Sequence, residues 1–201
     1  MALIENQVTV KYDSSSRVGY RHGRNFINCE GWFDETVPEL VCGAKKSTEA
    51  FLMVLCHEFC HFRQWKEKSG FCSDSITTTL DDFLSGKKLS KPRIFKCTKA
   101  VREMEWDCEK RSVTLMKQYG LSYNMKRMIQ RANAYIFFYT ALPTLKKWYK
   151  TGPSSIKEIV DLMPDEFLPI GAYDALPDGY IDLCRKHCFR FGKETEYAAT
   201  A

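Results

Sequence analysis

The most apolar segment of the chain is also its clearest helical pattern. Residues 50–56 form an unbroken apolar run. Ser47, just before the run, is a typical helix-capping residue, and Gly70 is a typical helix stop. Between them the sequence changes from apolar to polar after His61. The pattern predicts a helix over about residues 47–69 that enters the core at its amino-terminal half.

Several other segments also have helical spacing. They cover residues 97–119 with a stop at Gly120, 76–84, 121–150 with a bend at Pro143, and 180–190. The aromatic run 135–139 is apolar on all sides, which predicts burial. Residues 7–12 alternate like a strand, whereas 19–24 and 28–31 are typical of turns.

A strand is also predicted at 37–41, at a sheet edge because of Pro38. The segment Thr36–Cys42 is therefore a candidate for binding a substrate backbone by strand addition, with a purely structural role as the equal alternative. Together these patterns predict an α+β fold. We expect one mainly helical domain over residues 1–201, with a small sheet packed on the helix at 47–69.

The first predicted helix contains the motif His57-Glu58-x-x-His61. Residues four apart project from one helix face, so both imidazoles can bind one Zn²⁺. Glu58 then lies beside the metal, where it can take a proton from a water that the metal acidifies. With only four histidines in the chain, the motif is expected by chance roughly 0.005 times.

A third metal ligand is expected from the predicted helix at 97–119. Glu103 and Asp107 are four residues apart and share a face. Glu105 lies about 200° round the helix from Glu103, so both cannot face the metal. Glu105 is the alternative metal ligand, and it has Glu109 four residues later in the same way.

The motif followed by Glu-x-x-x-Asp on a later helix resembles the gluzincin pattern of zinc metallopeptidases. The chain is similar in size to compact, uncharacterised members from bacteria and their viruses. The resemblance covers only these two helices. It implies a minimal zincin-like fold, one Zn²⁺ held by His57, His61 and Glu103, and a role for Asp107 in orienting a ligating histidine through its other ring nitrogen.

The sequence also bears on the location of the protein and on the state of its cysteines. The first residues lack a secretory signal and no run has membrane-spanning length, so we expect a cytoplasmic protein, in the host cytoplasm if viral. Nine cysteines are then expected to be free and mostly buried. Cys184-x-x-His187-Cys188 could share one face, but core packing is a better interpretation than a second metal site.

The leading functional hypothesis is zinc-dependent hydrolysis of a protein or peptide substrate, with Glu58 as the catalytic base. Candidate donors to the developing oxyanion are Tyr135, Tyr139, Tyr173, Tyr180 and His187. One alternative is a non-catalytic, zinc-stabilised binding or regulatory protein. Another is a protease acting on DNA-bound proteins, which clusters of basic residues such as Lys87-Lys88 would suit although no nucleic-acid motif supports it.

Overall fold

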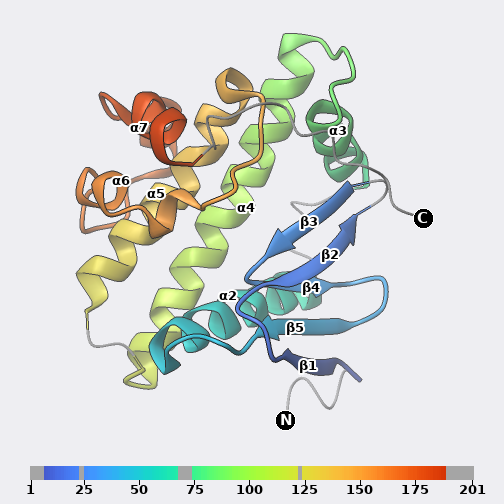
Figure 1. The fold of residues 1–201 in the computed structure, drawn as a ribbon, viewed down its shortest axis with the longest axis vertical. Coiled ribbons are helices and arrows are strands. Elements are labelled where there is room, and N and C mark those ends of the chain that lie inside the picture. Colours follow the sequence, from blue (N-terminus) through green and yellow to red (C-terminus); the bar gives the residue numbers. More distant parts are fainter. Residues whose placement is uncertain (1–6, 23–24, 68–73, 122–123, 189–201) are drawn as a thin grey trace.

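The computed structural model describes residues 7–22, 25–67, 74–121 and 124–188. Within these ranges the protein is a mainly helical, single-domain α+β fold with a small sheet (Figure 1). The predicted fold class is therefore confirmed. None of the helices in these ranges combines the length and apolar character that a membrane crossing requires.

The amino-terminal third forms five short strands: β1 (Thr9–Asp13), β2 (Val18–His22), β3 (Asn25–Cys29), β4 (Gly31–Asp34) and β5 (Glu39–Gly43). β5 pairs in parallel with β1 and antiparallel with β4, and β2 pairs with β3 as an antiparallel hairpin. The turn predicted at 28–31 is thus right only at Glu30, a bend between β3 and β4, and that at 19–24 is wrong for residues 19–22; positions 23 and 24 lie outside the described residues. Gly19 and Asn28 face each other across the hairpin, where strand pairing overrides their local turn preference.

The segment proposed for strand addition is also placed differently from the expectation. Its strand, β5, is the central strand of the described three-stranded sheet, with β1 and β4 on its two sides. Because both of its backbone edges are used in pairing, a peptide cannot extend the sheet at β5. The strand-addition role of Thr36–Cys42 is therefore excluded.

The helices are α2 (Thr48–Lys66), α3 (Asp74–Leu84), α4 (Lys91–Gln118), α5 (Met125–Leu145), α6 (Lys157–Asp161) and α7 (Tyr180–His187). Two 3₁₀ turns, η1 (Pro153–Ser155) and η2 (Ile170–Asp174), lie in the carboxy-terminal segment. Ser47 caps α2 as predicted, with its side chain accepting from the Ala50 amide. The stop predicted at Gly70 lies outside the described residues.

α4 begins at Lys91, earlier than the expected start at 97, because Pro92 occupies its first turn. A proline there costs no helical hydrogen bond, since the first amides of a helix have no partner within the helix. The Gly120 stop is confirmed, with a φ of +61°. α5 contains Pro143 in its last turn, and four of the five residues in the predicted aromatic run are buried.

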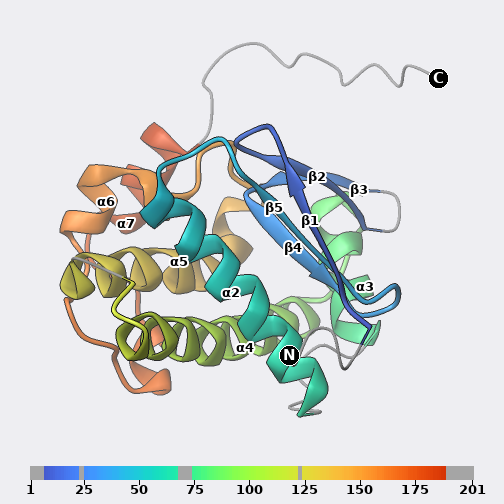
Figure 2. The ribbon, with the colours of Figure 1, turned by 90° about the horizontal axis from the view of Figure 1, so that it is seen from below.

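α2 lies between the sheet and the helices α4 and α5 (Figure 2). Phe62 packs against Leu40 and Cys42 of the sheet, whereas Cys56 packs against Val113 of α4 and Met128 of α5. α4 and α5 run side by side, and the carboxy-terminal segment packs on α5. The buried residues of α2 run from Cys56 to Gln64, whereas the apolar run 50–55 is only half-buried. The core therefore encloses the carboxy-terminal half of α2 and not, as predicted, its amino-terminal half, and the His-Glu-x-x-His segment lies in that buried half.

Candidate metal centre

Two helices supply the side chains of the candidate site. α2 contributes His57 and His61 from one face, and α4 contributes Glu105 from the stripe of buried residues that faces α2. That stripe runs at helical spacing through Val101, Glu105, Cys108 and Ser112. A carboxylate in the middle of a buried stripe is costly unless it has a charged or hydrogen-bonding partner.

Three ligand atoms form a nearly regular triangle. The Nε2 atoms of His57 and His61 lie 3.1 Å apart, and Oε2 of Glu105 lies 3.5 Å from each of them. Two of these atoms are imidazole nitrogens and the third is a carboxylate oxygen, all of which bind divalent metals. The triangle is therefore a candidate metal-binding face.

The two oxygens of Glu105 have different surroundings. Oε1 lies 3.2 Å from the Tyr135 hydroxyl and 3.3 Å from the Tyr139 hydroxyl, and the two hydroxyls are 2.7 Å apart, so one donates to Oε1 and the other donates to its neighbouring hydroxyl. Oε2 is buried and meets no well-aligned hydrogen-bond donor among the described residues. The tyrosines thus fix the carboxylate so that its unsatisfied oxygen points to the two histidines, as a metal ligand would.

Each histidine is oriented through its other ring nitrogen. Nδ1 of His61 lies 2.9 Å from Oε1 of Gln64, and Nδ1 of His57 lies 3.2 Å from Oε1 of Glu109. Partners of this kind fix the tautomer that carries hydrogen on Nδ1 and leaves Nε2 free to bind a metal. Both imidazoles are therefore arranged with Nε2 directed to the same point.

Asp107 does not orient a histidine directly, as predicted, but acts through Gln64. Its Oδ2 accepts from Nε2 of Gln64 at 2.8 Å and from Nε of Arg111 at 2.7 Å. Gln64 in turn contacts His61, and it also donates to the Met104 carbonyl at 3.0 Å. Asp107 thus positions the residue that orients His61, whereas Glu109 makes the direct carboxylate contact to His57.

A buried thiol lies beside the histidines. Sγ of Cys108 is 3.7 Å from Nδ1 of His57 and 3.3 Å from the His57 carbonyl oxygen. One ligand atom from each of His57, His61 and Cys108 lies within 4.8 Å of the others, so this group could also hold a metal ion. The site therefore offers two alternative third ligands, the Glu105 carboxylate and the Cys108 thiolate.

The electrostatics of the site favour a bound cation. Burial opposes a charge on His57 and His61, yet the pKa of each is raised, through Cys108 together with Glu109 at His57 and Glu105 at His61. Burial likewise opposes ionisation of Glu105, but its pKa is lowered by the two histidines and Tyr135. The acidic neighbours thus favour positive charge at the two imidazoles, which protons or a metal cation could supply.

The preferred third ligand from the sequence, Glu103, does not reach the site. The printed sequence places it two residues before Glu105, about 200° round the helix. Among the described residues, Glu103 makes no ion pair or hydrogen bond with either histidine. The geometry instead selects the alternative, Glu105, with Glu109 one turn later, because α4 turns its Val101–Ser112 stripe towards α2.

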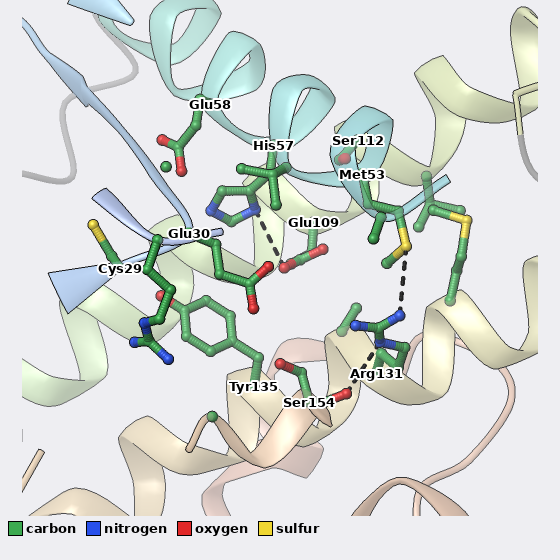
Figure 3. A pocket seen from close by; sticks show the side chains of 18 of the residues that line it. Cys29, Glu30, Met53, His57, Glu58, Glu109, Ser112, Arg131, Tyr135 and Ser154 are labelled. Atoms are coloured by element: carbon green, nitrogen blue, oxygen red, sulfur yellow. Dashed lines mark hydrogen bonds and ion pairs between the residues drawn. The ribbon is translucent and has the colours of Figure 1, made fainter. Parts of the chain in front are cut away.

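A pocket of about 190 Å³ adjoins the metal-binding face (Figure 3). His57, Glu58 and Glu109 line one part of it, and Tyr135 and Arg131 of α5 line another. Glu58 is only 7% exposed, and burial raises its pKa, as would suit a group that accepts a proton. The predicted catalytic carboxylate thus lies at a pocket beside the two histidines.

Gly31 at the start of β4 makes room for Glu58. A Cβ at this position would lie 2.6 Å from Cγ1 of Val54 and 3.1 Å from Cγ of Glu58. These distances are too short for ordinary contacts, so any side chain at position 31 would push against α2 beside Glu58. β4 can approach the motif helix this closely only with glycine.

The five candidate oxyanion donors lie in different surroundings, and these surroundings show which of them is near the pocket. Tyr135 lines the pocket, with its ring centre 6.1 Å from that of His57. Tyr139 is buried against Glu105, whereas Tyr173 donates to Asn133 and Tyr180 donates to the Ala134 carbonyl in the core. His187 lies on α7. Of the five, Tyr135 alone is in the described lining of the pocket.

Cys184 and Cys188 are buried in the core formed by α5 and the carboxy-terminal segment. This agrees with core packing. In the described ranges, the cluster at His57 is the only group of three histidine, cysteine or acidic side chains close enough to share a metal. The described cysteines are all free, as expected.

Sequence reasoning did not identify Gln64 or Cys108 as parts of the site, and it named Tyr135 and Tyr139 only as possible oxyanion donors. One signal was present in the spacing: Glu105 lies four residues after Val101 and three before Cys108, on an otherwise apolar stripe. An acid at such a position must have a buried partner.

Comparisons of the chain with protein-family models, curated proteins and solved structures found no match.

Proposed function

We propose that the protein is a zinc-dependent metallopeptidase in which His57, His61 and Glu105 bind the metal. The observation that carries the proposal is the triangle formed by the two Nε2 atoms and Oε2 of Glu105, with edges of 3.1, 3.5 and 3.5 Å. Ligands about 2.0–2.1 Å from a tetrahedral zinc are about 3.3–3.4 Å apart. The triangle therefore has the size of one face of a zinc tetrahedron.

Three protein ligands leave the fourth position of the tetrahedron open, which is the arrangement of catalytic zinc. A bound zinc would supply Lewis-acid chemistry and lower the pKa of a water in that position. Glu58, buried at the edge of the pocket, would accept the proton of the attacking water and pass it to the leaving amine. The pocket beside Glu58 would receive the substrate.

The surrounding residues would keep this arrangement in place. Tyr135 and Tyr139 hold one oxygen of Glu105, while Gln64 and Glu109 hold the imidazoles. Tyr135 also lines the pocket, so its hydroxyl is the best-placed candidate to stabilise an oxyanion. Hydrolysis of a peptide bond in particular follows from the resemblance of the motif to the gluzincin pattern.

The first experiment is elemental analysis of the purified protein after reconstitution with zinc. We expect one zinc per chain in the wild type, loss of zinc in Glu105→Gln, and retention in Glu103→Gln, the matched control from the same helix. Cys108→Ser tests the other ligand set and should retain zinc. Loss of zinc in Cys108→Ser together with retention in Glu105→Gln would overturn the proposed site.

The catalytic part of the proposal needs a second measurement. Glu58→Gln should keep one zinc and lose at least about 100-fold in peptide hydrolysis, because removing a general base typically costs that much or more. The readout is cleavage of a mixed peptide library followed by mass spectrometry. Undiminished cleavage by Glu58→Gln would contradict the mechanism.

The second candidate function is a metal that stabilises the fold without catalysis. The closeness of Cys108 to the histidines favours it, because cysteine and histidine ligands are common in closed structural zinc sites. In that case Cys108→Ser would lose the metal and unfold the protein, and Glu58→Gln would have no effect. The two variants thus separate the two functions.

A further inference from the structure

Arg131 on α5 points into the pocket that adjoins the metal-binding face (Figure 3). Its Nε donates to the Ser154 carbonyl at 3.0 Å, and its Nη1 lies 3.8 Å from Sδ of Met53. Both acceptors are uncharged, and the thioether is a weak one. Among the described residues, no carboxylate lies within 4.0 Å of this guanidinium.

Most other described arginines on the helices have carboxylate partners, although Arg93 contacts the Thr79 hydroxyl instead. Arg102 pairs with Asp174, Arg111 with Asp107, and Arg127 with Asp161 on the outer side of α5. An arginine side chain stays charged, and placing it in a confined pocket costs free energy unless an anion compensates it. Arg131 therefore has a charge that the protein itself does not neutralise.

The carboxylates of the pocket are engaged elsewhere. Glu30 pairs with Lys46 at 3.2 Å, and Glu109 contacts His57 at 3.2 Å. Figure 3 shows Arg131 and Ser154 on the opposite side of the pocket from Glu58. Arg131 thus lies away from the carboxylates beside the candidate metal ligands; a second guanidinium, that of Arg17, also lines the pocket and donates to the Lys150 carbonyl at 3.3 Å.

We propose that Arg131 is an anion-binding subsite and that the substrate presents a carboxylate to it, favouring glutamate next to the scissile bond. The inference rests on the proposed peptide hydrolysis and names the substrate class of that site. Met53, Val113 and Met128 also line the pocket, and their apolar walls match the two methylene groups of a glutamate side chain. The guanidinium can bind the carboxylate through two parallel hydrogen bonds.

The wild-type test compares peptides that differ only in charge. One series has a single Glu, Asp or Gln on either side of the cleaved bond, and a second series carries a free or amidated carboxyl terminus. A hydrogen bond to a charged group is worth about 10- to 100-fold, so we expect kcat/KM to fall by that factor from Glu to Gln. A preference for the free terminus instead would assign Arg131 to the terminal carboxylate of the substrate.

The variants connect this preference to Arg131. In Arg131→Gln the preference for Glu over Gln should disappear, whereas Arg131→Lys should keep part of it by retaining the charge. Arg127→Gln is the matched control on the same helix, because Arg127 is outside the described lining of the pocket. Zinc content and melting temperature, measured for each variant, show that the fold and the metal site are intact.

A binding experiment tests this inference independently of the proposed activity. Zinc-loaded Glu58→Gln protein is titrated with fluorescein-labelled Glu and Gln peptides, and fluorescence anisotropy gives their Kd values. Tighter binding of the Glu peptide, lost in the Glu58→Gln, Arg131→Gln double variant, supports the subsite even if no peptide is cleaved. Equal Kd and equal kcat/KM for the Glu, Asp, Gln and terminal series would overturn it, while leaving zinc-dependent cleavage intact.

Discussion

Glu105 shows how the surroundings of a single residue can direct its chemistry. Two tyrosine hydroxyls occupy one carboxylate oxygen and leave the other facing the two histidines. A carboxylate with both oxygens in water would lose more conformational entropy in adopting this geometry on metal binding. The hydrogen bonds between side chains therefore hold the candidate ligand in place, as binding of a metal there would require.

The carboxylate of Glu109 leads to a prediction at the same scale. Removing the group that orients a ligating histidine commonly weakens metal binding by about 10–100-fold. We expect that loss in Glu109→Ala, because Oε1 of Glu109 is the partner of Nδ1 of His57. A competitive zinc titration with a chromophoric chelator measures it. Glu103→Ala is the control, and equal affinity in the two variants would contradict this role for Glu109.

Gly31 gives a second residue-scale prediction. Gly31→Ala should destabilise the protein by about 1–3 kcal/mol and lower peptide hydrolysis, because the new methyl group collides with Val54 and presses on Glu58. Gly171→Ala is a matched control, since a Cβ there meets no atom within 4 Å. Urea denaturation gives the free energy of unfolding. If both variants behaved alike, the close approach of β4 to α2 would be wrong.

At the scale of elements, the rotation of α4 about its axis selects the acids that reach the site. Either Glu103 with Asp107 or Glu105 with Glu109 could have faced α2, because both pairs have helical spacing. Val101 and Met116 pack against neighbouring helices and Cys108 contacts His57 of α2, and together these contacts turn Glu105 inwards. The local sequence contains both possibilities, and the contacts between helices select one.

Asn133 links α5 to the carboxy-terminal segment and permits a prediction about that contact. It is fully buried, donates to the carbonyls of Pro164 and Glu166, and accepts from the Tyr173 hydroxyl. Asn133→Ala leaves these groups without partners and should cost about 2–4 kcal/mol of stability. Urea denaturation is the measurement, and the exposed Lys157→Ala should leave the unfolding midpoint unchanged. A loss below 1 kcal/mol, well under what one unsatisfied buried group costs, would show that the segment can repack.

At the scale of the whole molecule, the candidate metal would join α2 to α4 and so couple metal binding to stability. Free zinc at a thousand times its Kd adds about 4 kcal/mol to the folded state, which for a chain of this size raises Tm by about 8–16 °C. We expect this rise in the wild type and in Glu58→Gln, and its loss in Glu105→Gln. Calorimetry with zinc and with a chelator measures it, and a Tm independent of zinc would exclude the site.

The sequence by itself determined the fold class, the α2 helix with its Ser47 cap, and the pairing of His57 with His61. Each of these depends on periodicity or spacing within one segment, and a helix converts such spacing directly into a shared face. These features could therefore be predicted from residues that are close together in the sequence.

Only the tertiary structure decided the choice of Glu105 over Glu103, the central position of β5, and the partnership of Gln64 with Asp107. Each depends on contacts between residues far apart in the chain. Such contacts are set by how helices and strands pack together, because the local pattern leaves the rotation of a helix and the neighbours of a strand open.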